Sequence, residues 1–414
     1  MSRIGYRYKS QTDCRDRCLN SLPLADGLKS ALLSLLPFIS HAIQNDRQHR
    51  RFLSVRNRSH HRSLPAICWL PHSIPLGESA GYDQHRERQN YNCCESQMIN
   101  QTKTIATEQV VSPISSSKLN KKSLCDYVLN VASGCLHGCT FCYVPSTPVI
   151  RMRGKALQEK GVSDPQLDWG DYLFVRDEVP EQLEARLARN PKWKETASGK
   201  GVVMLCSGTD PYQNGQTAKV TRACVQVLLN HGKRVRILTR SPLWTKDLDI
   251  LVHPNVTVGM SLPHLDDNIS RQVEPGAPLP SDRLKALEMG KFAGCRLYVA
   301  MAPTAPVHGV EDFQRYFDAV LPLNPEVIFW EPINARGSNG KRMIDAGIDW
   351  VSQVTTQKQW ADNFYSQYNQ IIQVLQERSA IHLLHPWFDP ALPTIGGVDI
   401  NSWFYRPTIE QWGE

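Results

Sequence analysis

Three cysteines lie within eight residues of the segment GCLHGCTFCYVPSTP (134–148). Cys135, Cys139 and Cys142 are separated by four and then three positions, and no fourth cysteine lies near them. Thiolate sulfur is a soft ligand that suits zinc or an iron-sulfur cluster. A structural zinc site usually has four protein ligands, whereas a cluster held by three cysteines leaves one iron free to bind another molecule. The spacing therefore favours a metal centre with an open position.

Two other interpretations of the cysteines stay open at this point. His137 would complete a zinc site of three cysteines and one histidine, and the thiols could carry no metal at all. The chain has 12 cysteines in total. In a secreted protein that number would suggest disulfides, but a tight triple in an enzyme-like chain is more typical of metal binding. We therefore expect a reducing, cytoplasmic environment.

From residue 126 onward the chain alternates short apolar runs with stretches of helical periodicity, such as 218–232, 282–294 and 311–321. This alternation predicts an α/β fold, a partial (βα)6 barrel of the TIM type over residues 122–335. An extra strand and helix are expected within 171–188. Residues 336–414 are expected to supply a C-terminal helix, a short strand and a tail that pack on the barrel. The six candidate barrel strands are Tyr127–Ala132, Val202–Ser207, Arg234–Thr239, Val256–Leu262, Arg296–Ala302 and Val327–Pro332.

Residues 1–100 have a different composition from the rest of the chain. They hold 14 Lys and Arg against 8 Asp and Glu, so they carry most of the net charge of +7. They lack sustained periodicity, and we expect a largely disordered extension. A basic arm for nucleic acid is one alternative, and a true start at Met98 is another hypothesis. The apolar stretch 28–43 is too short to span a bilayer and contains Pro37, so no membrane partner is expected.

The CxxxCxxC spacing, with Phe141 before the last cysteine, resembles the signature of radical S-adenosylmethionine enzymes. The resemblance continues past the cysteines. Four further segments, in order along the chain, are similar to the spore photoproduct lyase-like branch of that superfamily: SGTDPYQ (207–213), LTRSPLWTKDLDIL (238–251), VEPGAPLPSDRLKAL (273–287) and YVAMAPTAP (298–306).

This resemblance implies a 4Fe-4S cluster on Cys135, Cys139 and Cys142 whose open iron binds S-adenosylmethionine. In such enzymes an electron from the cluster cleaves the cofactor to a 5′-deoxyadenosyl radical, which abstracts hydrogen from a substrate. It also implies a reductant such as a flavodoxin or a ferredoxin. The substrate is unknown, and nucleic acid is one candidate. The rival hypothesis is a non-catalytic protein that binds metal through cysteine, or that binds nucleic acid.

The resemblance further implies roles for individual residues. Cys206, after the second barrel strand, corresponds to the place of a hydrogen donor, although a buried strand cysteine is the more common state. Polar residues at strand ends also occur without any ligand, and Asp210 before Pro211 is typical of a turn. The cofactor-binding candidates are Phe141 and Tyr143 for the adenine, Ser207, Thr209 and Asp210 for the methionine amino group, Thr239 and Ser241 for the ribose or carboxylate, and Ser261 with a similar role.

Several charged residues have two interpretations each. Glu274 and Arg283 are expected to form a buried ion pair, while the alternative places Arg283 on the cofactor carboxylate. Charged loops are usually only solvated, but polar residues beyond the sixth strand also lie where a substrate would sit, and a basic patch after the cysteines would suit DNA. These residues are Glu331, Asn334 and Arg336 at the strand end, and Arg151, Arg153 and Lys155 in the patch, with Lys121 and Lys122 upstream.

Overall fold

The computed structural model describes residues 103–387, and the proposed extension 1–100 lies outside them. Its centre is an eight-stranded sheet with the order β11-β10-β9-β8-β7-β6-β3-β2. All neighbouring pairs from β3 to β11 are parallel, and only β2 (Ser115–Ser116) is antiparallel to its neighbour. The parallel strands are β3 (Tyr127–Leu129), β6 (Val203–Leu205), β7 (Val235–Thr239), β8 (Val256–Ser261), β9 (Arg296–Thr304), β10 (Ile328–Pro332) and β11 (Leu384–Pro386).

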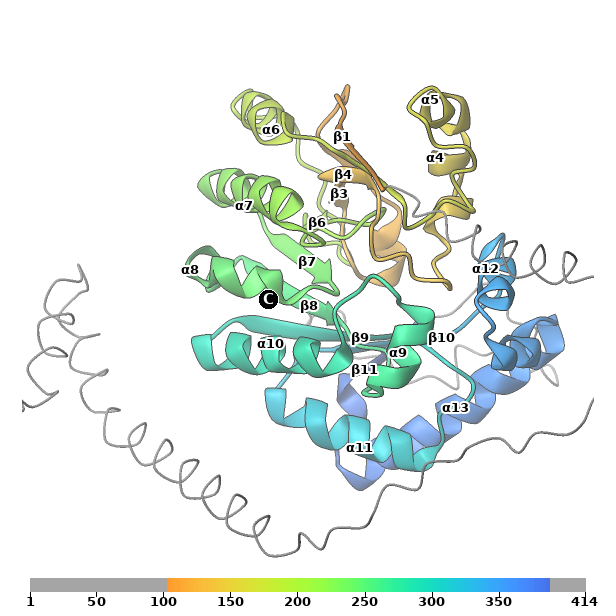
Figure 1. Cartoon of the computed structure of the whole chain (residues 1–414). Coiled ribbons are helices and arrows are strands. Elements are labelled where there is room, and N and C mark those ends of the chain that lie inside the picture. The colour runs from red at the N-terminus through yellow and green to blue at the C-terminus, as the bar shows by residue number, and fades with distance from the viewer. Residues whose placement is uncertain (1–102, 388–414) are drawn as a thin grey trace, which may run out of the picture. The chain divides into compact units, whose positions relative to one another are not determined.

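Helices follow the strands and cover the sheet, as Figure 1 shows. This arrangement confirms the predicted α/β fold with a partial barrel, because each parallel connection needs a crossover that is usually a helix. No helix among residues 103–387 is long and apolar enough to cross a membrane. The helices are α4 (Pro148–Arg151), α5 (Gly154–Gln158), α6 (Val179–Leu187), α7 (Gly215–Asn230), α8 (Leu248–Leu251), α9 (Asp267–Val273), α10 (Pro280–Ala293), α11 (Val310–Val320), α12 (Asn339–Asp345) and α13 (Gln357–Glu377).

The first predicted strand, 127–132, is wrong as a single element. The chain divides there into β3 and β4 (Ala132–Gly134), which belong to different sheets. β4 is antiparallel to β5 (Tyr172–Val175) in a separate three-stranded sheet. Between the two strands, the Asn130 side-chain oxygen accepts hydrogen bonds from the backbone N–H groups of Ser207 and Gly208, at 3.0 and 2.9 Å. This break moves the following cysteine segment off the barrel sheet.

The segment after the barrel returns to the sheet. The predicted tail helix is α13, and the predicted short strand is β11, which is parallel to β10 and lengthens the barrel sheet. Trp360, Phe364 and Ile371 on one face of α13 are buried in the main apolar core. Burial of that helical stripe is the main source of the stability of such a helix. The proposed division of the chain between residues 335 and 336 stays a prediction.

The small sheet is tied together by a buried carboxylate. Glu108, just after β1 (Thr104–Thr107), accepts charged hydrogen bonds from Arg153 Nη2 at 2.5 Å, Arg176 Nε at 2.9 Å and Lys160 Nζ at 3.1 Å. The Ser133 hydroxyl also contacts it. Burial alone would raise the pKa of Glu108, but the hydrogen bonds and positive charges outweigh this effect and lower the pKa to about 2. The ionised carboxylate thus joins β1, β4, β5 and the segment after the cysteines.

We predict that Glu108→Gln lowers the free energy of unfolding by about 3 kcal/mol at pH 7. A shift from 4.5 to about 2 corresponds to that amount, since one pKa unit is about 1.4 kcal/mol. Because the folded pKa is depressed, the contribution is present above pH 4.5 and is lost as the pH falls towards 2. Urea unfolding at pH 7, 4 and 3 measures this. Glu288→Gln, at an exposed position of α10, is the control. A constant difference between Glu108→Gln and wild type across this range contradicts the prediction.

Candidate active site

The three cysteines lie in a loop between β4 and the short 3-10 helix η2 (Val144–Ser146). Cys135 and Cys139 are buried, Cys142 is partly buried, and all three are free thiols. All three line one pocket of about 460 Å³, together with side chains from the ends of β6, β7, β8, β9 and β10. The carboxyl ends of barrel strands are where this class of fold places its functional groups. The loop therefore brings the cysteines to the functional end of the barrel.

The backbone of the cysteine loop is held by two segments that follow barrel strands. Gln213 Oε1 accepts a hydrogen bond from Leu136 N at 2.7 Å. Thr140 N donates to Val273 O at 2.9 Å, and Gly276 N donates to His137 O at 2.9 Å. A Cβ atom on Gly276 would lie 2.3 Å from Leu136 O, so only glycine allows this approach. Gly276 is thus a contact point of the cysteine loop.

Residues after the barrel hold the other half of the loop. Asn339 Nδ2 donates to Phe141 O at 2.9 Å. Arg342 donates to Thr140 O at 3.3 Å through Nε and to Cys142 O through Nη2. These carbonyl groups have no partner within a regular helix or strand, so the side chains of α12 satisfy acceptors that would otherwise be costly to bury. The helix α12 is therefore part of the support for the third cysteine.

Burial and a nearby positive charge have opposite effects on the pKa values of the thiols. Burial raises the pKa of Cys139 to about 12 and also raises those of Cys135 and Cys142. The nearby guanidinium of Arg240 acts in the opposite direction on Cys139 and Cys142. A metal ligand must be a thiolate, so a positive charge beside two of the three sulfur atoms favours the form that binds metal.

Arg240 is itself held by a buried charge chain. Its Nε donates to Glu274 Oε1 at 2.5 Å, and Arg283 Nη2 donates to Glu274 Oε2 at 2.7 Å. Glu274 and Arg283 are almost completely buried. The expected Glu274–Arg283 ion pair is thus present. Arg283 does not line the pocket, whereas Arg240 does and lies over the Phe141 ring at 5.4 Å.

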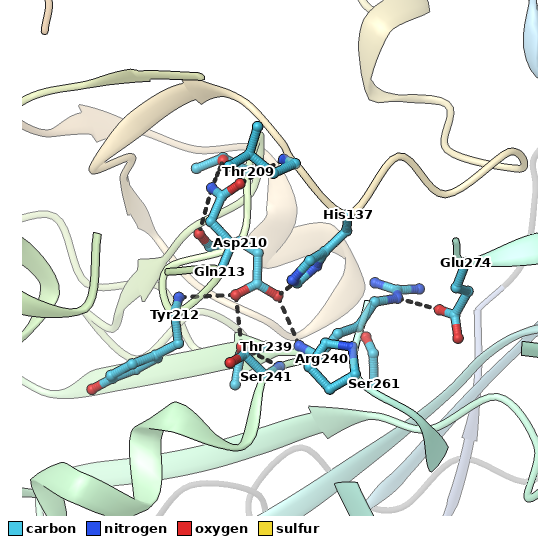
Figure 2. A network of polar contacts seen from close by, with 12 residues as sticks. His137, Thr209, Asp210, Tyr212, Gln213, Thr239, Arg240, Ser241, Ser261 and Glu274 are labelled. Atoms are coloured by element: carbon cyan, nitrogen blue, oxygen red, sulfur yellow. Dashed lines mark hydrogen bonds and ion pairs between the residues drawn. The ribbon is translucent and has the colours of Figure 1, made fainter. Parts of the chain in front are cut away.

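Asp210 organises the ends of β6 and β7 (Figure 2). Its Oδ1 accepts hydrogen bonds from Tyr212 N at 2.9 Å and Thr239 Oγ1 at 2.7 Å. Its Oδ2 accepts from Arg240 N at 2.7 Å and lies 3.6 Å from His137 Nδ1. Both oxygens of this carboxylate are thus engaged by the protein. Asp210 therefore fixes the positions of Tyr212, Thr239 and Arg240.

The donor set fits a cluster better than a single zinc ion. Between residues 103 and 387, no three His, Cys, Asp or Glu side chains are placed as ligands of one metal ion. Zinc needs sulfur donors at about 2.3 Å from one point, whereas each cysteine of a cluster binds a separate iron. His137, the proposed fourth zinc ligand, is turned to Asp210. All three thiols line one open pocket.

Most of the other predicted site residues gather at the same pocket. Ser207 is exposed. Within residues 103–387 its backbone N–H forms a hydrogen bond, but its hydroxyl forms none. Thr209 donates to Gly134 O and accepts from Gln213 Nε2, so it supports the cysteine loop. Ser241 does not line the pocket, because its hydroxyl accepts from Leu243 N at the start of the 3-10 helix η3 (Pro242–Asp247). Predicted residues that line the pocket are Phe141, Tyr143, Cys206, Ser207, Thr209, Asp210, Thr239 and Ser261.

The pocket lining also contains an amine and a carboxylate, those of Lys122 and Glu331. Lys122 Nζ lies 3.7 Å from Glu331 Oε2, and burial raises the pKa of Glu331. Lys122 also lies over the Trp387 ring at 5.3 Å. Asn334 and Arg336, which the sequence places near a substrate, line this pocket too. Of the proposed basic patch, Lys122 faces the pocket and Arg153 is bound to Glu108, so neither is a simple surface charge.

Sequence reasoning missed four supporting residues of the site. Arg240 stands inside the quoted segment 238–251, and its position directly after a strand was the available signal. Gln213 is the last residue of the segment 207–213. Its residue type alone does not predict the hydrogen bond that it accepts from the cysteine loop. Asn339 and Arg342 lie about 200 residues from the cysteine loop, and no spacing rule links them to it.

The family model of the Radical SAM superfamily matches residues 129–320. Among curated proteins, the chain is 32% identical over 229 residues to uncharacterized protein ORF301 of Acidianus two-tailed virus, covering 53% of this chain and 71% of that protein. It is 28% identical over 200 residues to an uncharacterized protein of Mycobacterium tuberculosis, covering 47% and 54%. The chain thus spans about half the length of the mycobacterial relative.

Two solved structures give the following comparisons. A spore photoproduct lyase variant with bound AdoMet and dinucleoside spore photoproduct has a TM-score of 0.48 and 13% identity, covering 69% of this chain and 82% of that chain. SuiB of Streptococcus suis, bound to the precursor peptide SuiA, has a TM-score of 0.41 and 12% identity, covering 86% and 62%. The family match begins in β3, contains all three cysteines and ends with α11. The chain belongs to the Radical SAM superfamily.

Proposed function

We propose that this protein holds a 4Fe-4S cluster on Cys135, Cys139 and Cys142 and reductively cleaves S-adenosylmethionine there. When bound, the two groups together supply a 5′-deoxyadenosyl radical that abstracts hydrogen from a substrate. The observation that carries this proposal is the convergence of the three thiols on a pocket at the carboxyl end of the barrel. Its volume of about 460 Å³ lies within the range of small-molecule sites.

Two features of the pocket support binding of S-adenosylmethionine. Arg240 presents a guanidinium whose Nε is held by Glu274, so its remaining N–H groups can donate to the cofactor carboxylate. Phe141 is an apolar platform for the adenine, and Ser207, Ser261 and the exposed Tyr143 line the same pocket. Asp210 then acts mainly by positioning Arg240, Thr239 and His137.

Cys206 is the proposed hydrogen donor for a substrate radical. Its thiol lines the pocket, is 4% exposed and accepts a hydrogen bond from Val131 N at 3.4 Å. Burial raises the pKa of Cys206 to about 12, so the sulfur keeps its hydrogen at neutral pH. A donor of a hydrogen atom must be in that form. The thiol is therefore in the state that the role requires.

We also propose a branch of the superfamily, a cellular compartment and a place of substrate entry for this protein. The four ordered segments from 207 to 306 support a place in the spore photoproduct lyase-like branch, and the three thiols require a reducing compartment such as the cytoplasm. The substrate would enter at the wall formed by Lys122, Glu331 and Trp387, where an ion pair lies beside a buried indole ring. Nucleic acid is one substrate that such a wall could accept.

We predict that Cys139→Ala lowers the iron content from about four atoms per chain to below one and abolishes 5′-deoxyadenosine formation, because a cluster ligand is lost. Iron analysis and mass spectrometry after anaerobic reconstitution and dithionite reduction measure both quantities. Cys295→Ala, which changes a partly buried cysteine between α10 and β9, should leave both unchanged. Unchanged iron in Cys139→Ala would rule out its ligand role.

We predict that Arg240→Gln weakens S-adenosylmethionine binding about tenfold, since a charge-assisted hydrogen bond contributes about 1.5 kcal/mol or more. Anaerobic calorimetry on the reconstituted full chain measures the dissociation constant. Arg271→Gln, at an exposed position of α9, is the control. Equal affinities for Arg240→Gln and Arg271→Gln would show that Arg240 does not contact the cofactor.

We predict that Cys206→Ala keeps the iron content and forms 5′-deoxyadenosine within about twofold of wild type, because the thiol acts only after the cofactor is cleaved. Once a substrate is identified, incorporation of solvent deuterium into its product should be lost, since an exchangeable thiol delivers the hydrogen. Mass spectrometry of the product in deuterated water measures this. Deuterium incorporation at the wild-type level in Cys206→Ala is the result that refutes the donor role.

A further inference from the structure

Two histidines that have no role in the proposed function lie together at the functional end of the barrel. His264 follows β8 and His308 follows β9, and these two strands are parallel neighbours in the sheet. Their carboxyl ends therefore meet, and the centroids of the two imidazole rings are 5.4 Å apart. Neither residue lines the pocket of the three cysteines. We call these two residues the histidine pair.

Both imidazoles are buried without the hydrogen bonds that would compensate for their burial. His264 is 5% exposed and His308 is 7% exposed. Nδ1 and Nε2 of His264 and Nε2 of His308 have no hydrogen-bond partner among residues 103–387. Burial of such a polar atom is costly, and in native proteins its partner is often a bound water or ion. Three such nitrogen atoms on two adjacent rings indicate a bound ligand at the histidine pair.

The charged groups around the histidine pair favour a cation as that ligand. The negative charge of Asp266 acts on both imidazoles, and that of Asp312 acts on one of them. The charges of Glu274 and Arg283 act on His264 in opposite directions. These two charges balance each other, because Arg283 Nη2 donates to Glu274 Oε2 at 2.7 Å. The remaining field at the two rings is therefore negative.

The two rings have the chemical form and the spacing that suit a metal ion. Burial lowers the pKa of His264 to about 4 and also lowers the pKa of His308. Both rings are therefore uncharged at neutral pH, and neutral imidazole is the form that binds metal. Two imidazoles that bind one zinc ion at the usual Zn–N distance of about 2 Å have centroids about 5 Å apart in tetrahedral geometry. The observed separation of 5.4 Å is close to this value.

We propose that His264 and His308 form a binding site for a divalent transition-metal ion such as zinc, with the carboxylate of Asp266 and water as its further ligands. Imidazole nitrogen suits zinc and similar ions. No three His, Cys, Asp or Glu side chains within residues 103–387 are preformed as ligands of one ion, so the carboxylate must turn towards the rings. Asp266 is exposed and caps α9 through Oδ1, whereas its Oδ2 accepts no hydrogen bond within the same range.

A metal ion at the histidine pair would join the loops that follow β8 and β9. The loop of His264 continues through α9 to Val273 and Gly276, which form hydrogen bonds with the backbone of the cysteine loop. The ion would thus stabilise a segment that supports the cysteines, without contact to them. This role is structural and does not depend on cleavage of S-adenosylmethionine.

Zinc binding by the full chain tests this site. In anaerobic calorimetry with Zn²⁺ alone, wild type should bind about one equivalent more than His264→Gln/His308→Gln. The cysteines are present in both proteins, so the zinc that they bind cancels in this difference. The control, His231→Gln/His382→Gln, removes two histidines at partly buried and exposed positions and should bind as much zinc as wild type. Equal zinc stoichiometry in wild type and His264→Gln/His308→Gln would overturn the proposal and leave water as the ligand of the pair.

A second variant keeps the test decisive if the loss of two buried rings disturbs folding. Asp266→Asn retains both imidazoles and a side-chain oxygen that can cap α9. It should weaken zinc binding at this site about tenfold, because a neutral amide replaces a charged ligand. Asp362→Asn, at an exposed position of α13, makes the same change away from the site and should bind zinc as wild type does. Equal zinc affinities for Asp266→Asn and Asp362→Asn would also overturn the proposal.

Discussion

The arrangement of the three thiols depends on hydrogen bonds that fix the irregular backbone of the cysteine loop. The backbone of residues 134–142 forms little regular structure after β4, so its polar groups need partners from elsewhere. Gln213, Val273, Gly276, Asn339 and Arg342 provide them. These residues come from three different crossover or terminal segments. Segments that follow the barrel strands therefore hold the cysteine loop in place. Their hydrogen bonds go to the backbone of the loop, so the three thiols are not needed as hydrogen-bonding partners.

Charge is arranged in two buried sets around this loop. Glu274 balances Arg283 and Arg240, and Glu108 balances Arg153, Arg176 and Lys160. Burial of an unpaired charge is costly, and breaking either set would leave one. The first set directs a guanidinium to the cysteines, whereas the second ties the small sheet to the helices after them. Arg240 thus lies beside the cysteines in the pocket, whereas Arg153, Arg176 and Lys160 surround the carboxylate that joins the small sheet to the segment after the cysteines.

Much of the fold could be predicted because its signal is local. Parallel strands buried on both faces appear as short apolar runs, and five of the six predicted barrel strands overlap single observed strands. The prediction failed at 127–132, where the apolar run is continuous but the chain changes sheets at Asn130. No local pattern reports that the Asn130 side chain binds the backbone of Ser207 and Gly208. The place of Ser241 was equally hard to predict, because a strand-end hydroxyl can face a pocket or cap the next turn, as it does here for Leu243 N.

The sequence by itself determined the chemical nature of the donors and the places along the chain of most barrel strands. These properties follow from residue type and periodicity, which act over a few positions. Only the tertiary structure decided which side chains face the pocket and which are used for support. Asp210 is engaged on both oxygens, Arg240 is aimed by Glu274, and Arg342 reaches Cys142 from 200 positions away. Such contacts depend on packing between distant segments, and no neighbouring residue in the chain encodes them.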